Sequence, residues 1–572
     1  MRHALFLSSA LVCALAPVGP VEAEAKAKER PKLVVLLVFD QMRGDYLSRW
    51  FDLYPEGGFR RMTGEGAWFA DCHYPYANTL TAPGHATLAT GCSPQKHGIV
   101  GNEWFDLASG KAVSCVEAGR YTLIPPQALD PNEKKDKDAD KKSRSVSPET
   151  LLSPTLADAI KKQFGKEARV VALSLKDRSS ILPGGKSPDA CYWADAAGRF
   201  VTSTYYRDRI HPWVADFNKS AYGDRWLGKS WDRLRPDVDY VKWAGPDDVV
   251  GEGKGSGQGR TFPHPFDGGK DKSMKVYRAA VANSPMGNEL LWELAKKAID
   301  AEKLGTRATP DFLSLSFSSN DLVGHAWGPD SQEVLDTTLR TDVLVKDILN
   351  TLDAKVGKGK YVVVLSADHG VCPVPEVSRD RKLDAGRADY QLLLGASEDF
   401  LDEKFPEVDA TAKDMNPWIA SARSNMLYLD RKKLKRRKIE RAEVEKALAV
   451  WLRKHPGIRA TYTRAEMTAD KMLDEIGRKV KSSYHPDRSG DVAVVLKPYW
   501  IPGDYLTGTT HGSPYPYDTH VPLVVFGTNV KPGKREGRVS PEHAAVILAA
   551  SLGIDPPGDA VKKVPEGLFG GK

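Results

Sequence analysis

The sequence predicts an α/β protein with a doubly wound, mostly parallel sheet that is flanked by helices and carries cap insertions over the carboxyl edge of the sheet. Three observations support this fold class. Short apolar runs rich in β-branched residues recur along the chain, helical patterns lie between them, and ionisable residues follow them. Continuous apolar runs are typical of strands covered on both faces, and their alternation with helices favours a parallel sheet.

Five segments match the strand pattern. They are Lys32–Asp40, Ala168–Arg178, Asp311–Asp321, Lys360–Gly370 and, as a fifth candidate, Thr519–Gly527. The helical pattern "SPTLADAIKKQFG" precedes the second segment, and "NELLWELAKKAIDAEKL" precedes the third. We expect all five to be buried parallel strands of one sheet.

Two regions interrupt this alternation, at about 180–290 and about 375–505. The first is rich in Trp, Tyr, Gly and Asp, and the second contains a charged helical stretch and the strand-like "GDVAVVLKPYW". We expect both to be insertions in a single domain over residues 24–572, and the tryptophans of the first to be core residues of a cap. Asn132–Glu149 has few apolar residues and is expected to be a mobile surface loop. The basic run Arg431–Lys438 could contact anionic lipid or substrate, but a solvated helix face is the favoured interpretation.

The N-terminus has the pattern of a secretory signal. Arg2 precedes an apolar run from Ala4 to about Ala16, and Val21-Glu22-Ala23 fits a signal-peptidase site. The run is too short to span a membrane, so residues 1–23 are predicted to be a cleaved signal peptide and the protein to be periplasmic or secreted. Five cysteines follow, and an exported protein could pair four of them. They are Cys72, Cys92, Cys115, Cys191 and Cys372.

Bulk composition argues against a nucleic-acid partner. The formal charge of +7 is modest for 572 residues, and basic residues are interspersed with acidic ones. No later segment approaches the length of apolar chain that a transmembrane helix needs. We expect a monomer.

Ionisable residues follow four of the predicted strands. Asp40 ends the first strand, Lys176 and Arg178 end the second, Asp321 ends the third, and Asp368-His369 ends the fourth. Because ligands bind outside the carboxyl ends of strands in open α/β sheets, we expect these side chains to meet in one site.

Three aspartates and three histidines in this set are candidate metal ligands. Asp321 and His325 share one face of a helix if a helix begins there, and His511 lies in the loop "TGTTHGSP". Mixed carboxylate and imidazole ligands suit Zn²⁺ or a similar divalent ion. Six such residues suit two metal ions, with three residues for each. The six are Asp40, Asp321, His325, Asp368, His369 and His511.

A candidate nucleophile lies in "NTLTAPGHATLATG", residues 78–91. Thr81 precedes an Ala-Pro-Gly turn, so it is expected to be the N-cap of a helix. A helix N-terminus favours a phosphate or a developing alkoxide. Direct coordination to a divalent cation would activate the threonine hydroxyl.

Ordered blocks over most of the chain resemble the alkaline phosphatase superfamily. The blocks are "VFDQMRGDYL", "TLTAPGHATLATGCSPQKHGIVGNEW", "LSLKDRSSI", "SSNDLVGHAWGP", "SADHG" and "THGSPYPYD". They are most similar to exported bacterial alkaline phosphatases of the phosphate-irrepressible type, which use a threonine nucleophile. The resemblance implies an alkaline-phosphatase-like fold and hydrolysis of small phosphate monoesters through a phosphothreonine intermediate, with two divalent metal ions as cofactors, for which Zn²⁺ is the favoured metal.

The resemblance also implies a role for each matching residue. Thr81 is the nucleophile. One metal ion is held by Asp40, Thr81, Asp368 and His369, and the other by Asp321, His325 and His511. The phosphate is bound by Asn102, Lys176 and Arg178.

Three alternative functions fit the sequence less well. Phosphodiesterases and nucleotide pyrophosphatases of the same superfamily share the metal ligands, but the two cations Lys176 and Arg178 favour a dianionic monoester. The segment "CSPQK" nearly matches a sulfatase pattern, but Lys replaces Arg and Cys92 follows the Thr81 helix, so Cys92 is expected to be structural. A non-enzymatic, metal-stabilised envelope protein would not need Thr81, Asn102, Lys176 and Arg178 together.

Three further histidines are expected to have structural roles. His85 is expected to pack or cap inside the Thr81 helix, and His97 to shape the loop that carries Asn102. His520 is expected at the start of a strand.

Overall fold

The computed structural model describes residues 30–126, 146–267, 273–407, 416–469 and 474–570. Its centre is a ten-stranded sheet in which the neighbouring strands β12, β1, β11, β6 and β7 run parallel. Every residue of β1, β6, β11 and β12 is buried. The predicted α/β fold class is therefore confirmed. In order across the sheet, the strands are β20 (Gly533–Arg535), β2 (Ala67–Phe69), β19 (Leu523–Gly527), β12 (Tyr361–Ser366), β1 (Leu33–Phe39), β11 (Asp311–Phe317), β6 (Val170–Ser174), β7 (Ala190–Ala194), β8 (Phe200–Ser203) and β5 (Leu123–Ile124).

The fifth predicted strand has the opposite direction to the one expected. β19 pairs with β12 and with β2 in antiparallel fashion. The reason is its connection: the chain passes the His511 loop and the short helix α20 (Pro516–Thr519) and then enters β19 directly. The strand therefore begins at the edge where β12 ends, and it runs away from that edge.

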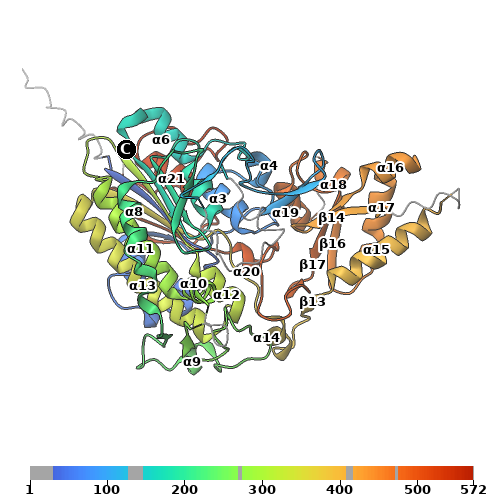
Figure 1. The fold of residues 1–572 in the computed structure, drawn as a ribbon, viewed down its shortest axis with the longest axis horizontal. Helices are drawn as coiled ribbons and strands as arrows, with labels where there is room; N and C mark the ends of the chain where they lie inside the picture. Colours follow the sequence, from blue (N-terminus) through green and yellow to red (C-terminus); the bar gives the residue numbers. More distant parts are fainter. Residues whose placement is uncertain (1–29, 127–145, 268–272, 408–415, 470–473, 571–572) are drawn as a thin grey trace, which may run out of the picture.

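Helices cover both faces of the sheet (Figure 1). α21 (His543–Ser551) packs on β1 and β12, and α11 (Pro285–Ala301) packs on β6 and β11. The two predicted helical patterns form α6 (Leu156–Phe164) and α11. α6 begins with a capping box, in which the Thr155 side chain and the Asp158 backbone N–H satisfy each other, as do the Asp158 side chain and the Thr155 N–H.

The region at about 180–290 contributes to the sheet, contrary to the prediction that it forms only a cap. β7 and β8 lie within it and extend the sheet beyond β6. These strands are only five and four residues long, so their apolar pattern is hard to recognise in the sequence. Farther along, Trp231 is fully buried, and its indole N–H donates to Asp336 at 2.7 Å. This tryptophan is a core residue, as expected, but it belongs to the main hydrophobic core and not to a separate cap.

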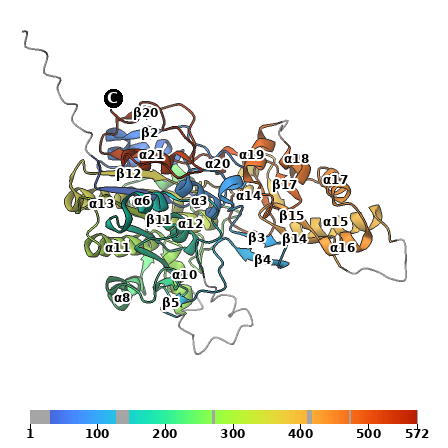
Figure 2. The same cartoon turned by 90° about the horizontal axis from the view of Figure 1, so that it is seen from above.

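The region at about 375–505 forms a lobe to one side of the main body (Figures 1 and 2). It contains a four-stranded sheet with its own hydrophobic core, which includes helices α15 (Tyr390–Lys404) and α17 (Arg441–Leu452). The lobe reaches the main body through Asn425, whose Nδ2 donates to the Gly512 carbonyl at 2.8 Å. In order across the lobe sheet, the strands are β14 (Ile419–Arg423), β15 (Met426–Leu429), β17 (Val492–Leu496) and β16 (Ile458–Thr463).

The basic run forms α16 (Arg431–Arg437), and its side chains are only partly solvated. Lys433 is buried, and its ammonium lies 4.7 Å from the centre of the Trp418 ring. The predicted signal peptide and most of the loop predicted at Asn132–Glu149 fall outside the described residues. Within the described ranges, no helix is both long enough and apolar enough to cross a bilayer.

The five cysteines after the predicted signal are all buried, and all are free thiols. The pairing that export would allow is therefore not formed. Their separate locations explain this: Cys191 lies in β7, Cys92 follows the Thr81 helix, and Cys372 follows β12.

Candidate active site

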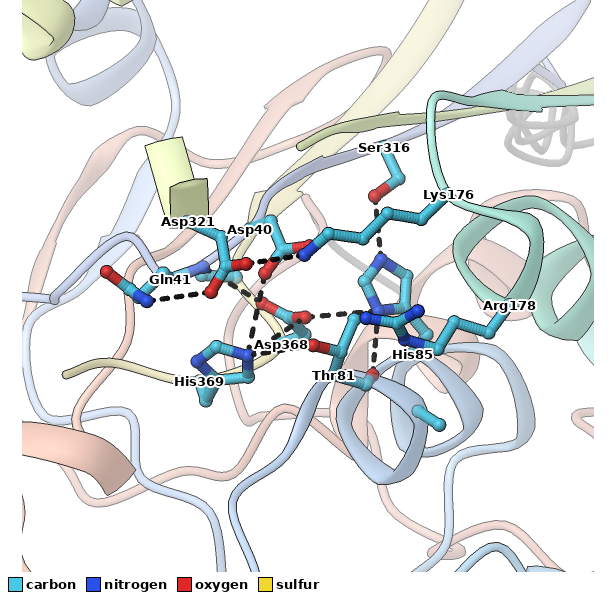
Figure 3. Close-up of polar contacts among 12 residues, drawn as sticks. Asp40, Gln41, Thr81, His85, Lys176, Arg178, Ser316, Asp321, Asp368 and His369 are labelled. Carbon is cyan, nitrogen blue, oxygen red and sulfur yellow. Dashed lines mark hydrogen bonds and ion pairs between the residues drawn. The ribbon is translucent and has the colours of Figure 1, made fainter. Parts of the chain in front are cut away.

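The carboxyl ends of four adjacent strands form the site, as the sequence predicts. Asp40 follows β1 directly, Lys176 follows β6 by two residues, and Asp368 follows β12 by two. Asp321 follows β11 in the first turn of α12 (Ser319–Trp327). Because these strands are neighbours in the sheet, their polar side chains converge in a small buried region (Figure 3).

The candidate metal ligands fall into two overlapping groups. In the first group, ligand atoms of Asp40, Asp368 and His369 lie within 4.8 Å of one another, and all three residues are buried. In the second, Asp321, His369 and His511 meet the same criterion. His369 belongs to both because its ring stacks on His511 with the ring centres 3.5 Å apart.

His325 joins the second group through Asp321. Its Nε2 lies 3.2 Å from Asp321 Oδ1, and the corresponding His511 distance is 3.6 Å. Asp321 and His325 are four residues apart on α12, so they share one helix face, as predicted. All six predicted metal-ligand residues therefore lie together.

The three imidazoles are all oriented by backbone carbonyls. Nδ1 of His325 lies 2.7 Å from the Thr509 oxygen, Nδ1 of His511 lies 2.7 Å from the Thr79 oxygen, and Nδ1 of His369 lies 2.9 Å from the Gly370 oxygen. A carbonyl can only accept, so each Nδ1 carries the proton. Each Nε2 lone pair is then free to bind a metal ion, which is the usual second-sphere arrangement of histidine ligands.

Thr81 begins helix α3 (Thr81–Thr90), but it is not the N-cap. Leu80 occupies that position in an extended conformation, and Thr81 is the first helical residue. The Thr81 side chain is 1% exposed, and its Oγ1 lies 3.4 Å from His369 Nε2. The hydroxyl thus lies beside the first metal-ligand group and at the positive end of the helix dipole.

Asn102 and Arg178 bring hydrogen-bond donors to the same place. Asn102 Oδ1 accepts the Ala82 backbone N–H at 2.8 Å, which places the Asn102 amide next to Thr81. The Arg178 side chain points towards Thr81 (Figure 3). Its buried Nε has no hydrogen-bond partner among the described residues, so it is a donor available to an anion.

The Lys176 ammonium lies between the two groups. Its Nζ is 2.7 Å from Asp40 Oδ2 and 2.6 Å from Asp321 Oδ2. Burial raises the pKa of Asp321, but Lys176 and His325 outweigh that effect and hold its pKa well below its usual range. Burial and the neighbouring Asp368 raise the pKa of Asp40 well above its usual range.

The donor set fits divalent cations. Oδ1 of Asp40 is buried and accepts no hydrogen bond from any described residue, while the buried Oδ2 of Asp368 lies 3.2 Å from His85 Nδ1. Burial and the imidazoles of His369 and His325 lower the pKa of His511 well below its usual range, so this ring is a neutral ligand. Buried carboxylate oxygens beside a neutral imidazole nitrogen are the ligands that Zn²⁺ binds.

The side chains expected to be structural are placed accordingly. His85 is buried in α3, where Nδ1 donates to the Thr81 carbonyl at 2.8 Å. His97 Nδ1 accepts the Ile99 N–H, and burial lowers the pKa of His97 to about 3. His520 lies three residues before β19 begins and not at its start, and its ring stacks on that of His73 with the ring centres 4.7 Å apart. Cys92 is buried beyond the end of α3, a full helix length from Thr81, so it does not face the site.

One residue of the site was not predicted from the sequence. Gln41 follows Asp40 and is hydrogen-bonded to both Asp321 and Asp368. The only feature of the sequence that points to Gln41 is its position as a polar residue just after a buried strand. That position does not predict the backbone conformation of Gln41.

The chain is similar to known proteins over most of its length. Residues 34–515 match the family described as type I phosphodiesterase / nucleotide pyrophosphatase. The chain is 35% identical over 536 residues to alkaline phosphatase PhoV of Synechococcus elongatus, covering 94% of this chain and 92% of that protein. It is also 35% identical over 548 residues to alkaline phosphatase PafA of Elizabethkingia meningoseptica, covering 94% and 95%.

Structural similarity extends over the same length. The crystal structure of wild-type PafA superposes with a TM-score of 0.86 at 34% identity, covering 95% of this chain and 100% of the PafA chain. The match of the family over most of the chain, and of full-length relatives above 30% identity, establishes the relationship. The chain belongs to the type I phosphodiesterase / nucleotide pyrophosphatase family of the alkaline phosphatase superfamily.

Proposed function

We propose that this protein is a phosphomonoesterase that hydrolyses phosphate monoesters to an alcohol and inorganic phosphate at a site with two divalent metal ions. The observation that carries the proposal is the position of the Thr81 hydroxyl. It lies at a helix N-terminus, 3.4 Å from an imidazole of the first metal-ligand group, and next to the donors of Asn102 and Arg178. Relatives named as alkaline phosphatases support the same function.

The reaction consists of two displacements at phosphorus. The Thr81 hydroxyl loses its proton to the solvent, its Oγ attacks the phosphorus, the P–O bond to the alcohol breaks, and the leaving alkoxide takes up a proton from the solvent. A water molecule then loses a proton to the solvent and attacks the phosphothreonine; the P–O bond to Thr81 breaks, Thr81 Oγ regains a proton, and inorganic phosphate is released. The Asn102 amide, Lys176 and Arg178 neutralise the phosphoryl oxygens by charge-assisted hydrogen bonds.

The metal ions would be held by the two groups described above. Asp40, Asp368, His369 and Thr81 would hold one ion, and Asp321, His325 and His511 would hold the other. When bound, such ions stabilise the attacking and leaving oxygens and lower the pKa of a coordinated hydroxyl or water. The mixed carboxylate and imidazole ligands favour Zn²⁺.

Substitution of Thr81 tests the chemistry. Thr81→Ala should abolish turnover of an aryl phosphate monoester while leaving the zinc content at two ions per chain, because six other side chains still provide ligands. A non-enzymatic metal-stabilised protein would show no turnover in either form. Substantial turnover by Thr81→Ala would contradict the nucleophile assignment.

A phosphodiesterase is the second candidate, and the family description favours it. A monoester is a dianion, so Lys176 and Arg178 should favour it over a singly charged diester. The test compares kcat/KM for an aryl monoester and a matched diester in the wild-type protein and in a variant with both Lys176→Ala and Arg178→Ala. The monoester preference should collapse in the double variant, and a preference that survives would contradict the substrate assignment.

The proposal extends to the cell compartment and the oligomeric state. The N-terminal pattern at residues 1–23 supports export to the periplasm or the medium, and the expected state is a monomer acting on small soluble phosphate monoesters. N-terminal sequencing of the protein purified from its host tests the cleavage, which should expose residue 24.

A further inference from the structure

Gln41 contacts one carboxylate from each candidate metal group. It is 2% exposed. Its backbone N–H donates to Asp368 Oδ1 at 3.0 Å, and its side-chain Nε2 donates to Asp321 Oδ1 at 2.7 Å (Figure 3). A carboxylate accepts hydrogen bonds and does not donate them, so the side-chain nitrogen of Gln41, and not its side-chain oxygen, faces Asp321. A single residue therefore links the two halves of the site.

The backbone of Gln41 indicates that its side chain has a specific task. Its φ is 69°, in the left-handed region that glycine adopts without strain and other residues adopt at a cost. Residues held in such conformations persist where their surroundings impose them, and they cluster at functional sites. Glycine would suit this turn better, so the glutamine is explained by what its amide does.

Gly324 leaves the space that this amide occupies. It lies on α12 between Asp321 and His325, and a Cβ atom built there would be 1.8 Å from Gln41 Oε1. Oε1 itself is buried without a hydrogen-bond partner among the described residues, so the bond to Asp321 is the one hydrogen bond from a described residue that holds the amide. The amide is held by steric fit against Gly324 and by the bond to Asp321.

We infer that Gln41 is a positioning residue that orients Asp321 and Asp368 so that the site binds two metal ions at once. The inference rests on the proposed two-metal site. A donor to a carboxylate oxygen fixes the orientation of that carboxylate, and losing such an outer partner typically costs about 10- to 100-fold in metal affinity. Gln41 does this for both groups, so it also sets their relative placement.

Gln41→Gly separates this role from a structural one. Glycine relieves the backbone strain and removes the amide. We expect zinc affinity, measured by chelator competition, to fall about 10- to 100-fold, with the Tm of the metal-free protein unchanged or raised. At saturating zinc, kcat should recover towards the wild-type value and KM should stay unchanged. Gln41→Glu keeps the shape but replaces the donor with an acceptor, so its zinc affinity should fall at least as far.

Gly324→Ala provides an independent route to the same effect. The added methyl displaces the Gln41 amide without altering any ligand, so zinc affinity should fall as it does in Gln41→Gly. In the double variant the two losses should not add, because both act on one hydrogen bond. Additive losses would overturn the inference.

Other outcomes separate this inference from the proposed function. If the wild-type protein binds two zinc ions and Gln41→Gly or Gln41→Glu binds them equally tightly, the inference fails and the two-metal site stands. A lower metal-free Tm with unchanged zinc affinity would make Gln41 a fold residue and would also overturn it. A wild-type protein that binds fewer than two ions would contradict the two-metal site itself.

Discussion

Asn102 uses the two ends of its amide differently. Oδ1 accepts the Ala82 N–H and so satisfies one of the free donors at the start of α3. Nδ2 makes no hydrogen bond to any described residue and is available to a phosphoryl oxygen. One side chain thus supports the helix start and supplies a donor beside Thr81.

Asn102→Ala should affect activity far more than stability. Removing one preorganised donor to a developing charge costs about 100-fold or more in rate, and we expect a similar loss in kcat/KM for an aryl phosphate. The lost bond to Ala82 should lower stability by only about 1 kcal/mol. Asn102→Asp is the matched control, because it keeps an acceptor for Ala82 but repels a dianion. Wild-type kcat/KM in Asn102→Ala would contradict the phosphate-binding role.

At the scale of elements, α3 packs directly against the loop that carries Asp368. A Cβ atom at Gly84 would lie 2.1 Å from the Asp368 carbonyl oxygen. The close approach of these two elements sets the distance between Thr81 and the first metal-ligand group. The glycine in "TAPGH" is therefore a packing requirement as well as part of a turn.

Gly84→Ala should push α3 away from Asp368. We expect a destabilisation of about 1–3 kcal/mol from overpacking and a reduced kcat, since Thr81 moves with the helix. Gly64→Ala on α2 (Phe59–Glu65) is the control, because no atom lies within 4 Å of a Cβ built there. Its Tm should stay the same or rise. Thermal melts and steady-state kinetics of both variants would decide; equal behaviour would refute the packing argument.

Helix α20 holds the His511 loop through Asp518. Oδ2 of Asp518 accepts from the Ser513 N–H at 2.8 Å and from the Ser513 hydroxyl at 2.5 Å. Burial raises the pKa of Asp518 to about 7. In the unfolded chain the pKa is about 4. Between about pH 4 and pH 7 Asp518 is protonated in the folded state and ionised in the unfolded chain. The stabilisation that this proton gives the folded state is therefore present at low pH and is lost as the pH rises through about 7.

Asp518→Asn should flatten that pH dependence. The wild-type free energy of unfolding should fall relative to the variant by up to about 1.4 kcal/mol per pH unit between pH 5 and 7. Melting curves at pH 5, 6, 7 and 8 would measure the difference. The exposed Asp555 provides a control, since Asp555→Asn should leave the slope unchanged. Parallel curves for the wild type and Asp518→Asn would show that Asp518 keeps an ordinary pKa.

At the scale of the whole molecule, the proposed metal ions join segments that are far apart in the sequence. The first group unites residues 40 and 368–369, and the second adds residues 321, 325 and 511. Bound ions would act as cross-links between β1, α12, the end of β12 and the His511 loop. Their contribution to stability is therefore global.

Chelation should destabilise the entire fold. An ion at 100 times its Kd stabilises the folded state by about 2.7 kcal/mol, so the loss of two ions should lower the Tm clearly. Calorimetry with and without a chelator would measure this, and added Zn²⁺ should restore the original transition. An unchanged Tm after verified metal removal would argue against ligation by these six residues.

The sequence predicts the centre of the molecule better than its borders. Asp40, Asp321 and Asp368 could be placed in one site because each follows a continuous apolar strand, and local pattern determines where such strands end. The direction of β19, the extension of the sheet by β7 and β8, and the sharing of His369 between two groups depend on long-range packing. The left-handed backbone conformation of Gln41 likewise could not be predicted from the local sequence, since glycine is the residue that usually adopts this conformation.

The carbonyls that orient His325, His511 and His369 have a consequence for sequence change. Main-chain oxygens persist whatever side chain the residue carries, so substitutions at Thr79 and Thr509 leave the proton acceptors for two imidazoles in place. Gly370 differs, because a Cβ atom there would lie 2.2 Å from the Tyr517 oxygen. Residues 79 and 509 can therefore change without altering the tautomers of His511 and His325, whereas the acceptor for His369 requires glycine at position 370.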